Sequence, residues 1–497
     1  MNYKLLIALI CSLTAAQAVL SQTMGERLGA AIQKLEADST LRHGTLSLHV
    51  EEAATGVVVF DLNGQVGLAP ASCQKLFTSV AALDLLGADY RYATRLGYRG
   101  KIEAGVLEGD LCLAGSGDPT LGSWRYDSTK EDVVLGRLVQ AVKGAGIRRY
   151  TGRLIGEEGR WGTESLPRGW IWEDIGNYYG AGAWGLNWHE NQYDVRLKSG
   201  TAIGDPAEIA GFRNEVQGLQ WINELKTGAP GSGDNAYIYL PPYSKMAFLR
   251  GTVPLQKEET VISGSIPMPS RQAELLFRDA LKKEGIGTEE GVGTREAIGT
   301  KEVAGSKGAD VMTRDAAAKD AGTKDAAARD ATIYIGQSVS PRLDSINYWF
   351  LRRSINLYGE ALIKTIALEK TGEASTEKGA ELVRDFWAQR GIDRSAVHII
   401  DGSGLSPQNR VTTDALVRVL QYARTRPWYP AFYQALPLIN KMHMKSGAIG
   451  GARSFSGYQV AADGKEYVFS IIVNNYDGSS SEVIKKLFNV LNILKPS

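Results

Sequence analysis

The sequence predicts an α+β fold in which an antiparallel sheet flanked by helices is interrupted by a large β-rich insertion. Two observations come from the two ends of the chain, each of which combines strand patterns with an amphipathic helix. The third comes from the middle, where residues 98–284 are rich in Gly, Trp and Tyr. At 497 residues the chain exceeds one ordinary hydrophobic core, so an inserted part is expected.

The N-terminal end predicts a helix, a hairpin and a second helix. Residues 24–37 have helical spacing, and the alternating stretches GTLSLHVEE and GVVVFDL follow as two strands. In APASCQKLFTSVAALDLLG, residues 69–87, apolar residues recur at the spacing of a buried helix. Because Pro70 favours a helix start, we expect Ser72 and Lys75 on one side of the first turn.

The C-terminal end predicts a hairpin and a closing helix. SFSGYQVAADGKEYVFSIIVNNY contains two strand patterns around Asp463-Gly464, a strong hairpin-turn signal. SSSEVIKKLFNVLNIL then predicts a helix with a serine cap. Both ends are expected to build one sheet. The chain thus divides into a leader (1–18), a sheet domain in two parts (24–97 and 333–497), a β-rich insertion (98–284) and a low-complexity insertion expected to be disordered (285–332).

The leader and the charge balance limit the setting and the partners. Lys4, a short apolar run and small residues up to Ala18 predict a signal peptide, and therefore export to the bacterial periplasm or cell envelope. With 56 basic and 55 acidic residues, the chain lacks the concentrated positive charge that nucleic acid binding needs. Cys73 and Cys112 are too few for a disulfide scaffold, and Cys73 is interpreted as a small buried hydrophobe.

Most familiar catalytic and binding motifs are absent or incomplete. The five histidines form no recognisable triad pattern, and neither GSGDP nor DGSGL is a nucleophile elbow. HENQY lacks the second histidine of a zinc motif, so we interpret His189 as structural. GAGAWG matches a dinucleotide pattern without a preceding strand. Five clustered tryptophans favour a packed β-rich core, with sugar stacking as the alternative.

Three short motifs together indicate a serine nucleophile with a lysine base. Burial or a nearby cation lowers the pKa of a lysine, so that its amine accepts the proton of a neighbouring hydroxyl. Ser72 and Lys75 form S-x-x-K, Ser354 and Asn356 form S-x-N, and Lys445-Ser446-Gly447 forms K-[ST]-G. Each motif alone is weak evidence. In this order they are typical of penicillin-recognising serine enzymes.

With these motifs and the stretches GSGDPTL, DGSGLSPQNRVT and MKSGAIGGARSFSGY, the chain resembles the D-alanyl-D-alanine carboxypeptidase/endopeptidase family of low-molecular-mass, class C penicillin-binding proteins. The resemblance covers most of the mature chain. It implies a β-lactamase/transpeptidase-like catalytic domain, split into residues 24–97 and 333–497. Two departures stand out: Ile355 lies at an often polar position, and the segment before Lys445 is shorter than in relatives.

The resemblance also implies roles for individual residues. Ser72 is the acylated nucleophile, Lys75 its base, and Ser354 a proton relay supported by Lys445. The substrate-binding set is Asn356, Lys445, Ser446, Gly447 and Ala448. Asn356 orients the peptide amide, and Lys445 and Ser446 hold the terminal carboxylate of the substrate. The backbone amides of Ser72 and Ala448 form the oxyanion hole. No metal or organic cofactor is implied.

The expected function is removal of D-alanine from peptidoglycan stem peptides, with cleavage of D,D-crosslinks as a further activity and β-lactams as inhibitors. Two alternatives stay open on the same residues. A β-lactamase or esterase would deacylate nitrocefin or esters rapidly, and a catalytically weak wall-binding protein would bind the cell wall without penicillin labelling. Peripheral membrane association and the oligomeric state are also left open.

Overall fold

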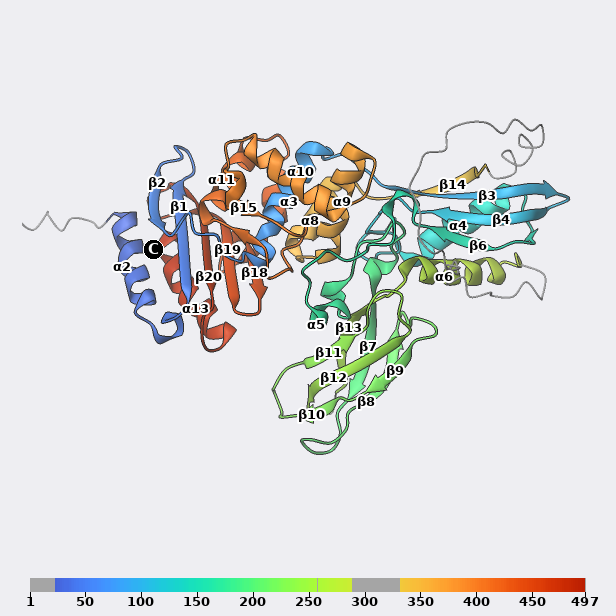
Figure 1. The fold of residues 1–497 in the computed structure, drawn as a ribbon, viewed down its shortest axis with the longest axis horizontal. Helices are drawn as coiled ribbons and strands as arrows, with labels where there is room; N and C mark the ends of the chain where they lie inside the picture. The colour runs from blue at the N-terminus through green and yellow to red at the C-terminus, as the bar shows by residue number, and fades with distance from the viewer. Residues whose placement is uncertain (1–22, 257, 288–330, 497) are drawn as a thin grey trace, which may run out of the picture. The chain divides into compact units, whose positions relative to one another are not determined.

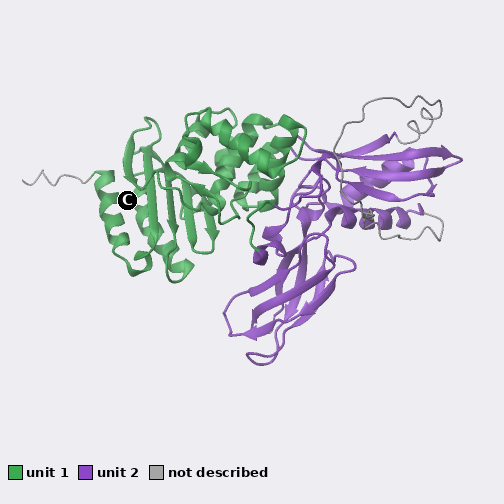
Figure 2. Ribbon diagram, viewed as in Figure 1, with its two compact units in different colours: residues 1–90, 167–171, 342–497 green, residues 91–166, 172–341 purple. Residues whose placement is uncertain are grey.

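The computed structural model describes residues 23–256, 258–287 and 331–496 (Figure 1). Two compact units emerge: unit 1 comprises residues 1–90, 167–171 and 342–497, and unit 2 comprises residues 91–166 and 172–341 (Figure 2). The predicted leader, 1–18, and residues 288–330 of the predicted low-complexity segment lie outside the described residues. Within the described part, no helix is long and apolar enough to span a membrane.

Unit 1 is built on one antiparallel sheet whose strands come from both ends of the chain. The strand order is β17-β18-β19-β20-β1-β2, and β1 pairs along its whole length with β20. This pairing confirms the sheet that the two ends predict, including the hairpin at Asp463-Gly464. The strands are β1 (Thr45–Glu52), β2 (Val58–Leu62), β17 (Leu438–Ile439), β18 (Met442–Ile449), β19 (Ala452–Val460) and β20 (Glu466–Asn474).

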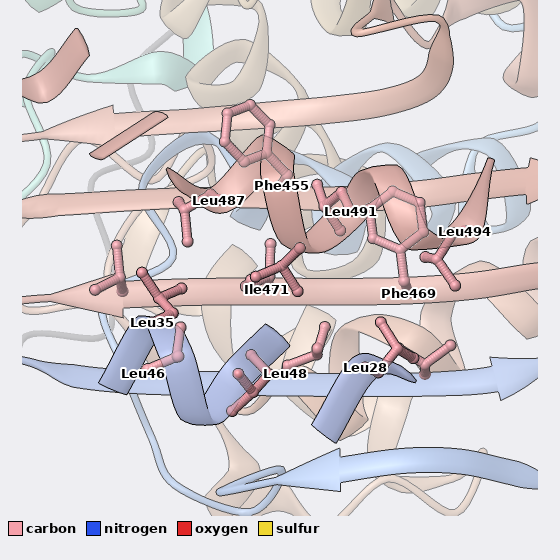
Figure 3. Packing of buried hydrophobic residues seen from close by; sticks show 14 of the residues in the cluster. Leu28, Leu35, Leu46, Leu48, Phe455, Phe469, Ile471, Leu487, Leu491 and Leu494 are labelled. Carbon is pink, nitrogen blue, oxygen red and sulfur yellow. The ribbon is translucent and has the colours of Figure 1, made fainter. Parts of the chain in front are cut away.

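Two terminal helices cover one face of this sheet. They are α2 (Met24–Glu36) and α13 (Ser480–Leu491), whose apolar side chains meet those of the central strands (Figure 3). A capping box between Thr23 and Glu26 starts α2, and the Ser479 hydroxyl accepts the Glu482 amide at the start of α13, as the serine cap predicted. Each fully buried leucine in this layer contributes about 1.5–3 kcal/mol.

The remaining helices of unit 1 surround α3 (Lys75–Leu85), which packs against α8, α9, α10 and α11. The helix predicted to start near Ser72 begins instead as a 3₁₀ turn, η2 (Ala71–Gln74). Ala71 has φ 45°, so the chain enters this turn from a left-handed conformation rather than directly as an α-helix. Side chains three residues apart eclipse in a 3₁₀ turn, which keeps Ser72 and Lys75 on one side. The other elements are η1 (Ser39–Leu41), α8 (Leu343–Arg352), α9 (Asn356–Thr371), α10 (Thr376–Ala388), η6 (Arg394–Ala396), β15 (Val397–His398), β16 (Arg410–Val411), α11 (Thr413–Arg424), α12 (Tyr429–Ala435) and η7 (Asn492–Leu494).

Unit 2 contains three sheets. The first has the order β14-β3-β4-β5 with β6 beside β4, and packs its apolar side chains with those of two helices, α4 (Glu131–Gly144) and α6 (Pro269–Lys283). Its strands are β3 (Ala93–Glu103), β4 (Val106–Ala114), β5 (Arg149–Tyr150), β6 (Leu154–Glu157) and β14 (Ile333–Val339). Because β3 pairs with β14, unit 2 extends beyond 98–284 on both sides.

The other two sheets of unit 2 share a hydrophobic core. One has the order β13-β7-β8, and the other β10-β12-β11 with β9 beside β12. The elements are β7 (Gln192–Lys198), β8 (Glu208–Arg213), β9 (Gln220–Asn223), β10 (Lys226–Gly228), β11 (Asn235–Tyr239), β12 (Met246–Pro254) and β13 (Thr260–Ser265), with short helices η3 (Gly159–Trp161), α5 (Trp172–Ile175), η4 (Tyr178–Gly180) and η5 (His189–Asn191). Of the five clustered tryptophans, four are buried and Trp172 is 49% exposed.

Candidate active site

Lys75 is the centre of a hydrogen-bonded cluster inside unit 1. Its side chain is fully buried, and its Nζ lies 2.9 Å from Ser72 Oγ. The same nitrogen donates to Asn356 Oδ1 at 2.6 Å and to the Ser403 carbonyl at 2.7 Å. A neutral amine has two N–H groups and one lone pair. A neutral amine can therefore donate to Asn356 and Ser403 and turn its lone pair to the Ser72 hydroxyl, whereas an ammonium donates to all three oxygens.

The electrostatic surroundings favour that neutral amine. Burial, followed by the charge of Lys445, holds the pKa of Lys75 well below its ordinary value. Asp401 and Glu360 oppose this shift because their negative charges favour a protonated amine. The net shift is toward the neutral amine, which is the form that a lysine base requires.

Strand β18 lies directly against the turn that carries Ser72. A Cβ built on Gly447 would stand 2.4 Å from the Pro70 carbonyl oxygen and 2.9 Å from the Ser72 nitrogen. The Cys73 thiol, fully buried as the sequence predicts for a small hydrophobe, donates to the Lys445 carbonyl at 3.2 Å. The K-[ST]-G motif therefore borders Ser72, and only a residue without a side chain fits at position 447.

Lys445 and the strand edge around it are shaped by a tight hairpin. Asn440 and Lys441, the turn residues between β17 and β18, both have positive φ, as a two-residue type I′ turn requires. This turn is the shortened approach to Lys445 seen in the sequence. Lys445 is 1% exposed, and burial lowers its pKa to about 8. Its amine therefore keeps its proton at neutral pH.

The edge of β18 beyond this hairpin is left unpaired by β17, which pairs only with Met442 and His443. Along the rest of the strand Ser446 is half-buried and Ala448 is exposed. These two residues adjoin Gly447 and so belong to the stretch that borders Ser72.

Ser354 stands just before α9 in a strained conformation. Its φ of 56° is left-handed, which costs a residue with a side chain of order 1–3 kcal/mol and is typical of functional sites. Asn356 begins the helix two residues later and contacts Lys75. Hydrogen bonds thus join Ser72, Lys75 and Asn356 directly, and the close approach of Gly447 adds strand β18. Ser354 is placed only by its position two residues before Asn356.

The segment 401–409 completes the cluster. The stretch DGSGLSPQNRVT contributes to the family resemblance, but none of its residues was predicted to belong to the site. The buried Asp401 carboxylate accepts the Gly404 and Ser406 amides, both at 2.7 Å, and the Trp170 indole N–H at 2.9 Å. These bonds fix the backbone that presents the Ser403 carbonyl to Lys75. The dense run of Gly, Ser and Asn after Asp401 is the one sequence signal for such a structured loop.

A second cluster in unit 1 has the residue types of a metal site. Among the described residues, His49, Glu51 and Asp414 bring potential ligand atoms within 4.8 Å of one another. His49 Nδ1 contacts Asp61 at 2.6 Å, and its Nε2 contacts Glu51 at 3.2 Å. Although burial acts to lower it, these carboxylates raise the pKa of His49. The hydrogen bonds and charges between His49 and these carboxylates account for this cluster. In unit 2, His189 bonds the Gly122 carbonyl, in keeping with a structural role.

The sequence matches one family over nearly its whole length and several characterised relatives. The family is D-Ala-D-Ala carboxypeptidase 3 (S13), matched over residues 28–313 and 319–492. The D-alanyl-D-alanine carboxypeptidase of Actinomadura sp. (strain R39) is 27% identical, over 94% of this chain and 85% of the relative. The D-alanyl-D-alanine carboxypeptidase DacB of Haemophilus influenzae is 21% identical, over 86% of this chain and 84% of the relative.

A solved structure shares the fold. Penicillin-binding protein 4 (DacB) of Haemophilus influenzae superimposes with a TM-score of 0.73, covering 95% of this chain and 99% of that chain at 19% sequence identity. The same protein complexed with a β-lactam superimposes with a TM-score of 0.69, covering 94% of this chain and 99% of that chain at 18% identity. The likeness confirms the predicted fold class of mixed sheets flanked by helices with large β-rich parts.

Proposed function

The chain belongs to the D-Ala-D-Ala carboxypeptidase 3 (S13) family and is a serine-type D-Ala-D-Ala carboxypeptidase, and we propose that Ser72 is its nucleophile. The single observation that carries this assignment is the hydroxyl–amine pair of Ser72 and Lys75, 2.9 Å apart with the amine buried. The substrate is the D-Ala-D-Ala end of peptidoglycan stem peptides, and β-lactams acylate the same hydroxyl.

In the acylation step, the Ser72 oxygen attacks the carbonyl carbon of the terminal peptide bond while Lys75 Nζ takes the hydroxyl proton. The two other partners of the amine, Asn356 Oδ1 and the Ser403 carbonyl, hold it with its lone pair toward Ser72. The new bond is the ester between Ser72 and the substrate. The broken bond is the amide to the departing D-alanine, whose nitrogen must gain a proton.

Ser354 delivers that proton. Its position at the start of α9, two residues before Asn356, places it in the motif that contacts Lys75. The proton passes from the Lys75 amine through the Ser354 hydroxyl to the leaving nitrogen, and the charge of Lys445 supports the transfer. Water then hydrolyses the ester, which returns the free enzyme.

Strand β18 binds the substrate beside the nucleophile. Lys445 keeps its charge at neutral pH and, with the Ser446 hydroxyl, binds the terminal carboxylate of the peptide. Asn356 orients the peptide amide. The Ser72 and Ala448 amides stabilise the oxyanion, and the close approach of Gly447 to the Ser72 nitrogen supports their convergence.

The enzyme acts outside the cytoplasm. Residues 1–18 have the charge, apolar run and small residues of a signal peptide, so the mature chain is exported to the periplasm or cell envelope. Peptidoglycan, the substrate of this chemistry, is found in that compartment.

Labelling with a fluorescent penicillin tests the assignment. The wild-type chain should form a long-lived adduct that mass spectrometry maps to the peptide containing Ser72, and Ser72→Ala should abolish it. Ser116→Ala removes the serine of GSGDP in unit 2 and is the matched control that should label normally. An adduct on another residue, or labelling that survives in Ser72→Ala, would rule out Ser72 as the nucleophile.

A further inference from the structure

Glu360 is a buried carboxyl group beside the catalytic cluster that the reaction scheme leaves without a role. It lies one turn after Asn356 on α9, and its side chain is fully buried. Both of its oxygens accept the Gly402 amide, each at 3.1 Å. A buried carboxyl group is costly unless it is held by such bonds, so its place here calls for an explanation.

The backbone around Glu360 leaves little freedom between α9 and the loop. A Cβ on Gly359 would stand 2.8 Å from the Gly402 oxygen, and a Cβ on Gly402 would stand 2.1 Å from the Gly359 oxygen. The Thr78 hydroxyl donates to the same Gly402 carbonyl at 2.8 Å, which ties the loop to α3. Gly402 is therefore held between the two helices that carry Lys75 and Asn356.

The next residue after Gly402 makes the contact with the base. Ser403 presents its carbonyl to Lys75 Nζ at 2.7 Å, so any shift of Gly402 changes an acceptor of the amine directly. Glu360 is thus linked to Lys75 by two hydrogen bonds, one to the Gly402 amide and one from Lys75 to the Ser403 carbonyl, joined by the backbone of residues 402 and 403.

On the basis of the proposed function, we propose that Glu360 is a positioning residue for Lys75, which fixes the Ser403 carbonyl through its hydrogen bonds to the Gly402 amide.

The surroundings of Glu360 agree with a role that works through hydrogen bonds. Burial and the neighbouring Asp401 raise the pKa of Glu360 to about 8, so the group favours its neutral form and acts on the loop through the Gly402 amide. Lys364, also buried, follows Glu360 by one turn on the same helix.

The test is the second-order rate constant of penicillin acylation at neutral pH. Glu360→Ala removes the acceptor of the Gly402 amide and should acylate at least about ten-fold more slowly. Glu360→Gln keeps an acceptor for Gly402 and should restore most of the wild-type rate. Glu369→Gln makes the same chemical change at an exposed site on α9 and should match wild type.

The outcomes separate this inference from the proposed function. If the wild-type chain is not labelled at Ser72, the proposed function fails. If wild type is labelled and the folded Glu360→Ala variant acylates at the wild-type rate, Glu360 does not position the amine and the inference alone is overturned. Thermal melting reports folding. Loss of folding in both Glu360 variants would also overturn the inference, because the residue would then serve the fold.

Discussion

Replacing Gly447 by Ala tests the contact between strand β18 and the nucleophile turn. The added methyl group would stand 2.3 Å from Ser454 Oγ, 2.4 Å from the Pro70 carbonyl oxygen and 2.9 Å from the Ser72 nitrogen. Ordinary contacts begin at about 3.4 Å, so the backbone of Pro70–Ser72 must retreat by about 1 Å.

That retreat should slow acylation far more than it destabilises the fold. A misplacement of about 1 Å at a reacting group lowers the rate by about 10²-fold, equivalent to about 2.7 kcal/mol of transition-state stabilisation. Overpacking costs about 1–3 kcal/mol of folding free energy, and the antiparallel pairing of Gly447 with Ser454 does not depend on the side chain. The variant is therefore expected to fold and to react slowly.

The assay is the second-order rate constant for labelling by fluorescent penicillin, with thermal melting alongside. Gly450→Ala is the matched control, because a Cβ at Gly450 meets nothing within 4 Å, just beyond the end of β18. It should label at the wild-type rate. A Gly447→Ala variant that also labels at the wild-type rate would show that β18 does not border Ser72 as described.

Three further predictions concern the base, the loop and a buried acid. Lys75→Met keeps the side-chain volume but removes the amine, so the acylation rate should fall by about 10²–10⁴-fold. Lys370→Met is the exposed control and should not change the rate. A normal acylation rate of Lys75→Met at neutral pH would identify another base. Trp170→Phe removes the indole bond to Asp401 and should lower the free energy of unfolding by about 1–3 kcal/mol in denaturant titrations, which an unchanged midpoint would contradict. Burial raises the pKa of Asp118 from 3.8 to about 6, so the folded chain binds this proton more tightly than the unfolded chain does. The free energy of unfolding should therefore fall by about 3 kcal/mol as the pH rises from 3.8 to 6. Asp118→Asn should remove that loss, which melting curves at pH 4 and pH 7 would reveal; parallel pH dependence in both chains would refute it.

The sequence predicts the sheet of unit 1 because its signals are local and strong. Alternating apolar residues define β19 and β20, and Asp463-Gly464 marks the turn between them. The three motifs likewise carry their chemistry in side chains, so their ordered set points to one site. The 3₁₀ start at Ala71 was missed, because the helical spacing of the apolar residues does not distinguish the first turn of an α-helix from a 3₁₀ turn.

The contacts that hold Lys75 were harder to predict because they use backbone atoms. The Ser403 carbonyl accepts from the amine, and any residue type supplies a carbonyl, so the sequence has no signal for this bond. Glu360 did leave a trace, since it and Lys364 are the two charged residues in the helix pattern between Asn356 and Thr365. A lone acid on a buried face indicates a special environment, but the pattern does not reveal which backbone amide it will bind.

The two lysines of the site have different tasks, and their surroundings separate them. Lys445, with a pKa of about 8, keeps its proton at neutral pH and is suited to hold a carboxylate. Its charge is also one cause of the lowered pKa of Lys75. On the proposed roles, a substrate carboxylate at Lys445 offsets part of that charge and so raises the proton affinity of Lys75. The amine thus becomes a stronger base when a peptide with a free carboxylate is bound, which favours acylation by the substrates that the site is built to accept.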